Sequence, residues 1–139
     1  MKMLSDIRGF RNNNPGNIRR GQKWVGLRAI QTDPDFDQFS TPEFGIRALC
    51  KLLVNYQKKH RTTTIRLIIE RYAPNVENDT EAYVQHVAKL VATGPDLGYR
   101  LTNKTLLADI VSAIITHECG VQPYSRDIIM RGVNLAKGE

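Results

Sequence analysis

The sequence has only two cysteines and no long hydrophobic run. Cys50 and Cys119 are too few for a disulfide framework, and their spacing matches no zinc or CxxC pattern. No segment approaches the roughly 20 apolar residues that span a bilayer, and residues 1–14 lack the apolar run of a secretory signal. We therefore expect a soluble chain with buried thiols, made in a reducing compartment, that neither exports itself nor inserts into a membrane.

Acidic residues are the minority among the charges. Twenty Lys and Arg face 14 Asp and Glu, which gives a formal net charge of +6 over 139 residues. A positive excess favours a polyanionic partner: nucleic acid, an anionic membrane surface or an anionic cell-wall polymer. The densest basic run, residues 58–61, falls at a predicted helix end, where exposed carbonyls favour cations without any ligand. The length fits a single domain over residues 1–139.

Helical periodicity is scarce before residue 40 and strong after it. Residues 9–39 are rich in Gly, Asn, Asp and aromatics, and NNNPGN and DPDFD are turn signals, so they predict loops with a short hairpin. Beyond them the apolar spacing predicts helices within residues 42–60, 62–73, 78–94, 102–120 and 124–138. The third is expected to start with a capping pattern at Asn78 to Glu81 and to close at Gly94; Gly120 is expected to end the fourth. The result is a mainly α domain with a small irregular lobe.

One of these predicted helices carries a carboxylate on its apolar face. The spacings i, i+3, i+4, i+7, i+8 and i+11 are occupied by Leu107, Ile110, Val111, Ile114, Ile115 and Glu118. We expect Glu118 to point inward at the end of the helix, with a raised pKa because aliphatic neighbours disfavour the ionised form. Such a group can act as a general acid. The alternative is that Glu118 reaches solvent or pairs with an arginine.

The segment HECGVQPYS resembles part of the soluble lytic transglycosylases and related lysozyme-like enzymes. In that family the catalytic Glu ends a helix and is followed by Pro and then Ser, which correspond here to Glu118, Pro123 and Ser125. Cys119 stands where the family usually has Ser.

Three further stretches resemble this superfamily in a permuted order. Residues 12–26, with a Trp-Gly turn, and residues 36–56 resemble the loop and helix that follow the catalytic helix in glucosaminidase-type hydrolases. Residues 68–87 resemble the transglycosylase stretch that contains the positions of Tyr72 and Tyr83, although YAP replaces the usual YNAG. The resemblance implies a circularly permuted α+β lysozyme-like fold. NNNPGNIR and PEFGIRAL also resemble phage virion proteins and phage lytic enzymes, either endolysins or virion-associated lysins.

The resemblance implies cleavage of the MurNAc-GlcNAc bond of peptidoglycan without cofactor or metal. Glu118 would act first as acid and then as base, so that the C6 hydroxyl of muramic acid attacks and a 1,6-anhydro product forms. Tyr83 would hydrogen-bond near Glu118 or the substrate. Trp24 and Tyr124 could stack on sugar rings, and the amides of Asn14 and Asn17 suit N-acetyl groups. Tyr72 and Ser125 are candidates because they match positions of the family.

Each candidate also has a structural interpretation. Tyr83 lies on a stripe with core valines, and Trp24 can anchor the lobe. Asn14 and Asn17 can satisfy turn backbone groups. His117 has no second histidine four residues on, which excludes the zinc metalloprotease pattern.

Two alternative functions remain open. A muramidase-type hydrolase would need a second carboxylate, and the candidates are Asp33, Asp35, Asp37 and Glu43; we favour turn and helix-start roles for these and therefore the transglycosylase. The other alternative is an inactive basic virion or nucleic-acid-binding protein, although no predicted helix has an arginine-dense recognition face. As an enzyme, the protein would reach the wall in the periplasm through a holin-type pore or a secretion machine, or would act as part of a phage particle.

Overall fold

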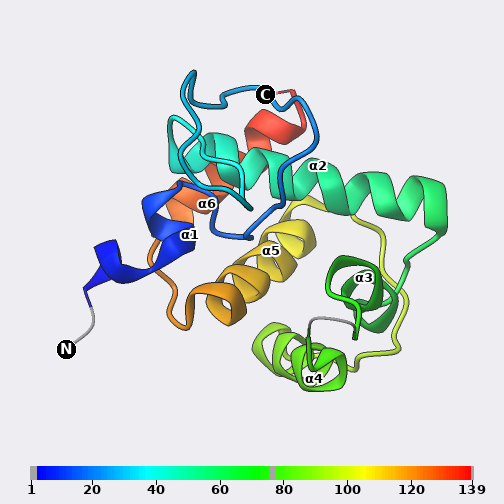
Figure 1. Cartoon of the computed structure of the whole chain (residues 1–139). Helices are drawn as coiled ribbons and strands as arrows, with labels where there is room; N and C mark the ends of the chain where they lie inside the picture. Colours follow the sequence, from blue (N-terminus) through cyan, green and yellow to red (C-terminus); the bar gives the residue numbers. More distant parts are fainter. Residues whose placement is uncertain (1–2, 76–77, 139) are drawn as a thin grey trace.

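The helices surround one central helix, with an irregular lobe on one side (Figure 1). The computed structural model describes residues 3–75 and 78–138. In chain order the elements are the 3₁₀ helix η1 (Leu4–Asp6), α1 (Arg8–Arg11), α2 (Pro42–His60), α3 (Ile65–Tyr72), α4 (Thr80–Val91), α5 (Lys104–Cys119) and α6 (Arg126–Ala136). The prediction of a mainly α protein is confirmed. Only η1 and α1 were not predicted, because so few residues carry no apolar period.

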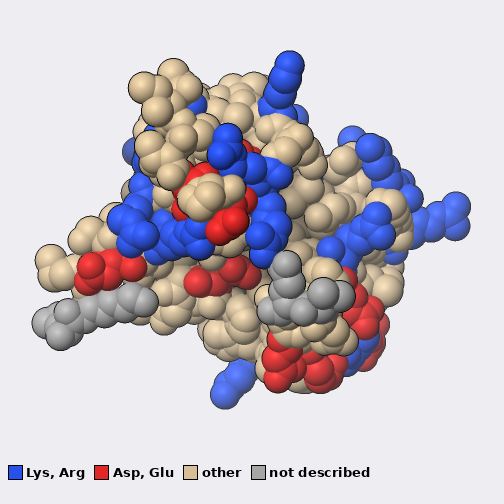
Figure 2. All heavy atoms as spheres, in the orientation of Figure 1, with Lys and Arg blue, Asp and Glu red and all other residues tan. Residues whose placement is uncertain are grey.

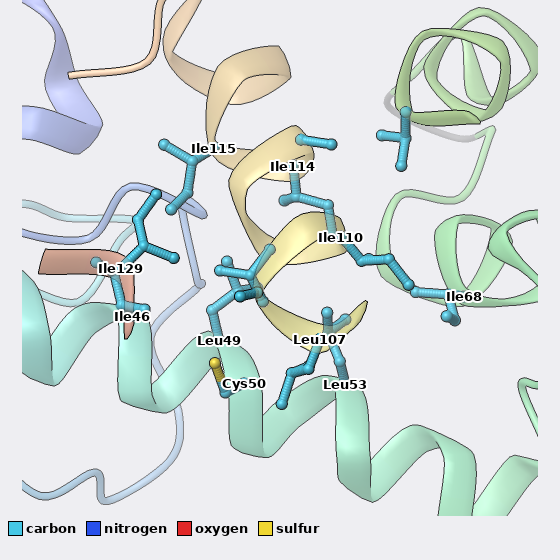
Figure 3. Close-up of a cluster of buried hydrophobic side chains, with 14 of the residues drawn as sticks. Ile46, Leu49, Cys50, Leu53, Ile68, Leu107, Ile110, Ile114, Ile115 and Ile129 are labelled. Atoms are coloured by element: carbon cyan, nitrogen blue, oxygen red, sulfur yellow. The ribbon is translucent and has the colours of Figure 1, made fainter. Parts of the chain in front are cut away.

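Helix α5 forms the centre of the packed body. Buried residues cover most of its circumference, and the partly exposed Asp109, Ser112 and Thr116 form the remaining strip. Figure 3 shows its Ile110 directed toward Ile68 of α3, and its Leu107 beside Leu53 of α2. All four of these side chains are completely buried. The close packing of α5 on several sides fixes its rotation and therefore the direction of Glu118 near its end.

The ends of α5 lie where the sequence predicts them. The Asn103 side chain accepts a hydrogen bond from the Leu106 backbone N–H at 3.0 Å, which caps the start. Gly120 ends the helix in the left-handed conformation, with φ of 78°, which glycine adopts without steric cost. These two caps place Glu118 in the last turn.

The predicted ends of α4 were wrong. Asp79, not Asn78, caps its start by accepting a hydrogen bond from the Ala82 backbone N–H at 3.1 Å. The helix then ends at Val91, and the left-handed residue that caps it is Ala92, with φ of 61°, rather than Gly94. The Thr93 backbone N–H donates to the Ala88 carbonyl oxygen at 3.0 Å, which closes a Schellman-type turn around a non-glycine residue.

The prediction of a short hairpin in residues 9–39 was also wrong. Among the described residues of this lobe there are only two isolated antiparallel bridges, which pair Arg19 with Phe36 and Leu27 with Phe39. Polar side chains take the place of a regular ladder. The Gln38 side chain, for example, accepts hydrogen bonds from the Thr32 backbone N–H and donates one to the Asn12 side chain.

The lobe rests directly on the helical body through two glycines. A Cβ atom on Gly45, in the first turn of α2, would collide with the Asn13 carbonyl oxygen. A Cβ atom on Gly16 would lie 2.7 Å from the Tyr72 hydroxyl and 3.1 Å from the Leu49 side chain. Glycine is therefore required where NNNPGN and PEFGIRAL meet. No helix in the described part of the chain has both the length and the apolarity to cross a membrane.

Candidate functional site

Glu118 is held by two side chains from distant parts of the chain. It is partly buried in the last turn of α5. Its Oε1 accepts a hydrogen bond from Asn17 Nδ2 at 2.9 Å, and its Oε2 accepts one from the Tyr83 hydroxyl at 2.7 Å. The partners are thus an amide of the lobe and a phenol of α4, rather than an arginine. Both carboxylate oxygens are oriented by hydrogen bonds, which pre-organises the group.

Tyr83 is a permanent hydrogen-bond donor in this arrangement. Its side chain is 1% exposed, and burial raises the pKa of the phenol far above its usual value, with the nearby Tyr72 and Glu118 adding to the effect. The hydroxyl therefore stays protonated near neutral pH and donates to Glu118. Tyr83 fulfils both sequence interpretations, because its ring packs in the core while its hydroxyl reaches the carboxylate.

Two histidines, His117 and His86, pack beside the Tyr83 ring. The rings of His117 and Tyr83 stack with centroids 3.6 Å apart. His117 Nδ1 lies 2.8 Å from His86 Nδ1, and burial together with His86 lowers the pKa of His117. Because one nitrogen must accept the shared proton, at least one of the two imidazoles is neutral. The sequence pattern predicts no positioning role for these histidines, although His86 lies one helical turn after Tyr83.

Glu118 lines a cavity of about 650 Å³ between the lobe and the start of the α3–α4 connection. Its lining is Gly16, Asn17, Ile18, Arg19, Arg20, Gly21, Gln22, Phe36, Leu52, Tyr56, Tyr72, Ala73, Pro74, Asn78 and Glu118. The volume lies within the usual range for small-molecule sites. Glu118 is the single carboxylate among the described lining residues, while Arg19 and Arg20 are cationic.

The predicted substrate-binding residues fall into two groups. Asn17 and Tyr72 line the cavity, and the Tyr72 hydroxyl donates to the Gly16 carbonyl oxygen. Trp24 is half-buried against the core and is not part of this lining. Ser125 is exposed at the start of α6, where its hydroxyl accepts a hydrogen bond from the Ile128 backbone N–H at 3.3 Å.

Two of these assignments require correction. The Asn14 side chain is completely buried, and its Nδ2 donates at 2.9 Å to the carbonyl oxygens of Ile18 and Asp37. Its amide thus stabilises the turn and is not accessible to an N-acetyl group. Tyr124 is 7% exposed and stacks on Phe10 with centroids 5.9 Å apart. Its ring is a packing element and offers no free face to a sugar.

None of the candidate second carboxylates is part of the described cavity lining. Asp33 and Asp35 both bind Arg8, at 2.5 Å and 3.0 Å, and the hydrogen bond from Arg8 holds the pKa of Asp33 well below its usual range. Asp37 is buried within the lobe, and this burial raises its pKa. Glu43 lies in a separate hollow and faces Arg131 at 4.0 Å. The suggestion of Glu43 as a partner of Glu118 is therefore corrected.

The fold and the site together define a mainly helical domain with a carboxylate-centred cleft. No family model matches the sequence. The chain is similar to Protein P5 of Pseudoalteromonas phage PM2, with 42% identity over 129 residues that cover 90% of this chain and 79% of the phage protein. The chain therefore belongs to the same family as this bacteriophage protein.

Proposed function

We propose that this protein is a peptidoglycan lytic transglycosylase that uses Glu118 as its single catalytic carboxylate. The observation that supports this most directly is the double hydrogen bond that orients Glu118 in a cavity whose described lining contains no second acid. A hydrolase of the two-carboxylate type places its second group within about 10 Å, beside the same bond. A transglycosylase needs only one acid, because the attacking hydroxyl belongs to the substrate.

The proposed reaction uses Glu118 twice. Protonated Glu118 donates its proton to the glycosidic oxygen as the bond to C1 of the muramic acid breaks, and positive charge builds on the sugar ring. The resulting carboxylate then removes the proton from the C6 hydroxyl, whose oxygen attacks C1 and closes the 1,6-anhydro ring. Glu118 is protonated again and no water is consumed. Tyr83 and Asn17 stabilise the carboxylate between the two steps by donating to its oxygens.

Contacts between the two ends of the sequence support the permuted lysozyme-like fold. Asn17 and Glu118 are 101 positions apart yet hydrogen-bonded, and the Cys119 thiol lies 3.7 Å from the Pro15 carbonyl oxygen. Burial raises the pKa of Cys119 to about 11, so the thiol is neutral and packs as a small apolar group. In the resembling enzymes the corresponding loop follows the catalytic helix in sequence. Here the same neighbourhood would be restored through space.

The substitution Glu118→Gln tests the proposal. The amide is nearly isosteric and cannot donate an acid proton, so we expect peptidoglycan cleavage to fall at least about 100-fold. Glu70→Gln is the matched control, because Glu70 is exposed on α3 and outside the cavity. Retention of more than about a tenth of wild-type activity, at an unchanged thermal midpoint, would end the proposal. Mass spectrometry of the products separates the reactions, since anhydro ends lack one water relative to reducing ends.

The basic lobe supports nucleic-acid binding as a second candidate. Figure 2 shows Lys and Arg gathered over the region where the lobe lies. A gel shift with duplex DNA, run beside a zymogram on purified peptidoglycan, separates the two functions. Clearing without a shift supports the enzyme, whereas a shift without clearing supports the binding protein. The phage relative suggests that the enzyme acts during lysis or as a virion component.

A further inference from the structure

We propose that His117, held by His86, is a positioning residue that keeps the Tyr83 hydroxyl on Glu118. His117 acts through Tyr83 and does not touch the reacting atoms, since neither histidine is part of the described cavity lining. The effect on cleavage rests on the proposed function, whereas the effect on the contact between Tyr83 and Glu118 does not.

The first observation is that two consecutive residues of α5 contact two parts of the same tyrosine. Glu118 Oε2 accepts a hydrogen bond from the Tyr83 hydroxyl at 2.7 Å. His117 covers a face of the Tyr83 ring, with centroids 3.6 Å apart and an interplanar angle of 25°. Aromatic pairs usually have centroids about 4.5–7 Å apart, so this stack is a close one. A contact at the face and another at the hydroxyl together fix both the tilt of the ring and the place of its oxygen.

The second observation is that His86 fixes the rotation of the His117 ring. His86 Nδ1 lies 2.8 Å from His117 Nδ1, and the two ring planes are inclined by 55°. A hydrogen bond depends on direction, so it selects one orientation of the imidazole, which the packing of an apolar ring does not do. His86 lies three residues after Tyr83 on the same face of α4. The pair is therefore anchored to the helix that carries Tyr83.

The four side chains form a closed set of contacts between α4 and α5. Each helix contributes two of them: Tyr83 and His86 come from α4, and His117 and Glu118 come from α5. Two hydrogen bonds join the helices, and the ring stack joins them a third time. In such a network each contact restricts the others. Loss of either histidine is therefore expected to loosen the bond between Tyr83 and Glu118.

The third observation concerns the titratable groups beside the stack. Burial raises the pKa of Tyr83 and Tyr72, and raises that of Cys119 to about 11, so these groups stay uncharged near neutral pH. The carboxylate that follows His117 accepts its hydrogen bonds from Tyr83 and the lobe. The pKa of His117 is lowered, by burial first and by His86 second. A neutral His117 can share one proton with His86, whereas two imidazoliums would face each other with two N–H donors. The positioning contact therefore persists at neutral pH and is lost once acid protonates both rings.

Carbon-13 NMR of protein labelled at tyrosine Cζ tests the contact without any substrate. The Cζ shift responds to hydrogen bonding of the hydroxyl, and Tyr83→Phe assigns the signal. We expect the Tyr83 signal to move in both His86→Ala and His117→Ala. The Tyr99 signal should stay in place. The matched control is His60→Ala, at an exposed histidine of α2, which should leave the Tyr83 signal unchanged.

A double-mutant cycle on cleavage tests whether His117 acts through Tyr83. On soluble peptidoglycan strands we expect His117→Ala to lower kcat about fivefold or more, with KM changed less than about twofold, because the histidine does not line the described cavity. In the Tyr83→Phe background the same substitution should cost less than about twofold, since the contact it protects is already gone. His117→Phe keeps a stacking ring but loses the bond to His86, so it should fall between wild type and His117→Ala.

Thermal midpoints of all variants separate a loosened contact from a loss of the fold. If His117→Ala does not fold, His86→Ala and His117→Phe carry the same test, because both keep a ring on Tyr83 and remove only the histidine pair. A loss from the His117 substitution that is equally large with and without the Tyr83 hydroxyl would overturn the inference. A Tyr83 signal that moves in none of the folded histidine variants would do the same.

The two experiments also distinguish this inference from the proposed function. Absence of cleavage by the wild-type protein would refute the transglycosylase, while the NMR shifts would still decide the positioning role. Cleavage in which the effects of His117 and Tyr83 are independent would refute the positioning role alone.

Discussion

The lobe and the helical body are stabilised by different chemistry. Among the described residues, five of the seven buried polar side chains belong to residues 9–39, namely Asn12, Asn14, Asp33, Asp37 and Gln38. The body buries mostly isoleucine, leucine, valine and alanine (Figure 3). Apolar burial is non-directional and scales with area, whereas hydrogen bonds depend on angle and distance. The candidate site lies where the two regions meet, with Tyr83 and Glu118 from the body and Asn17 from the lobe.

This difference explains how a loop can orient the Glu118 carboxylate. The lobe has almost no regular strand pairing, yet its turns are held by side chains that satisfy specific backbone groups, as Asn14 does. Such a network has a single good geometry. The apolar body provides most of the stability, and the polar lobe provides one of the two hydrogen bonds to Glu118.

The largest expected effect on stability comes from opening the apolar body. Ile110 is completely buried on α5, and Ile110→Ala should lower the free energy of unfolding by about 2–5 kcal/mol because it leaves a cavity. Denaturant titration measures the change. Leu90→Ala, at a residue 47% exposed, should stay within about 0.5 kcal/mol. Similar losses at both positions would contradict the assignment of the core.

Tyr83→Phe should affect activity more than stability. It removes the hydroxyl that donates to Glu118 Oε2 at 2.7 Å, and a hydrogen bond to a charged group contributes about 1.5–3 kcal/mol. We therefore expect peptidoglycan cleavage to fall about tenfold or more, read from muropeptide release. Tyr99→Phe, which removes a hydroxyl bonded to Thr93, is the control. Full activity of Tyr83→Phe would leave Tyr83 with a packing role alone.

Gly45→Ala tests whether the lobe depends on its contact with α2. The added methyl group would meet the Asn13 carbonyl oxygen, and such overpacking costs about 1–3 kcal/mol. Because Asn13 is close to Asn17, activity should fall along with the thermal midpoint. Gly98→Ala adds a methyl group in open space and should change neither. A well-tolerated Gly45→Ala would show that the lobe can shift without loss of the site.

The smallest effects should be those of pH on the lobe acids. The pKa of Asp33 is depressed by the Arg8 hydrogen bond, so its stabilising contribution is present above the usual aspartate pKa of about 3.9 and is lost as pH falls below that value. Burial raises the pKa of Asp37, so its ionisation opposes folding as pH rises past the same value.

Thermal midpoints measured from about pH 3 to pH 7 distinguish the two aspartates. Asp33→Asn should flatten the acid-side loss of stability, whereas Asp37→Asn should raise the midpoint near neutral pH. The reverse pattern would contradict the assigned causes. A similar response from both variants would show that the Arg8 contact does not set the behaviour of Asp33.

The sequence predicted α5 well because its signals are local. Asn103, Gly120 and the apolar spacing between them all act within a few residues, and together they place Glu118 on the inner face. The partner that the lobe supplies to Glu118 could not be predicted in the same way. Asn17 is 101 positions away, and nothing in its neighbours distinguishes it from Asn14, which is buried in the turn.

The sequence by itself determined the five longer helices, the caps of α5 and the inward phase of Glu118, because backbone propensity and apolar periodicity operate over a few turns. Only the tertiary structure decided which amide reaches the carboxylate, that Tyr124 packs on Phe10 rather than facing a ligand, and that Arg19 and Arg20 line the cavity. These features depend on where the lobe packs on the helices, and that position results from many weak contacts between segments distant in sequence.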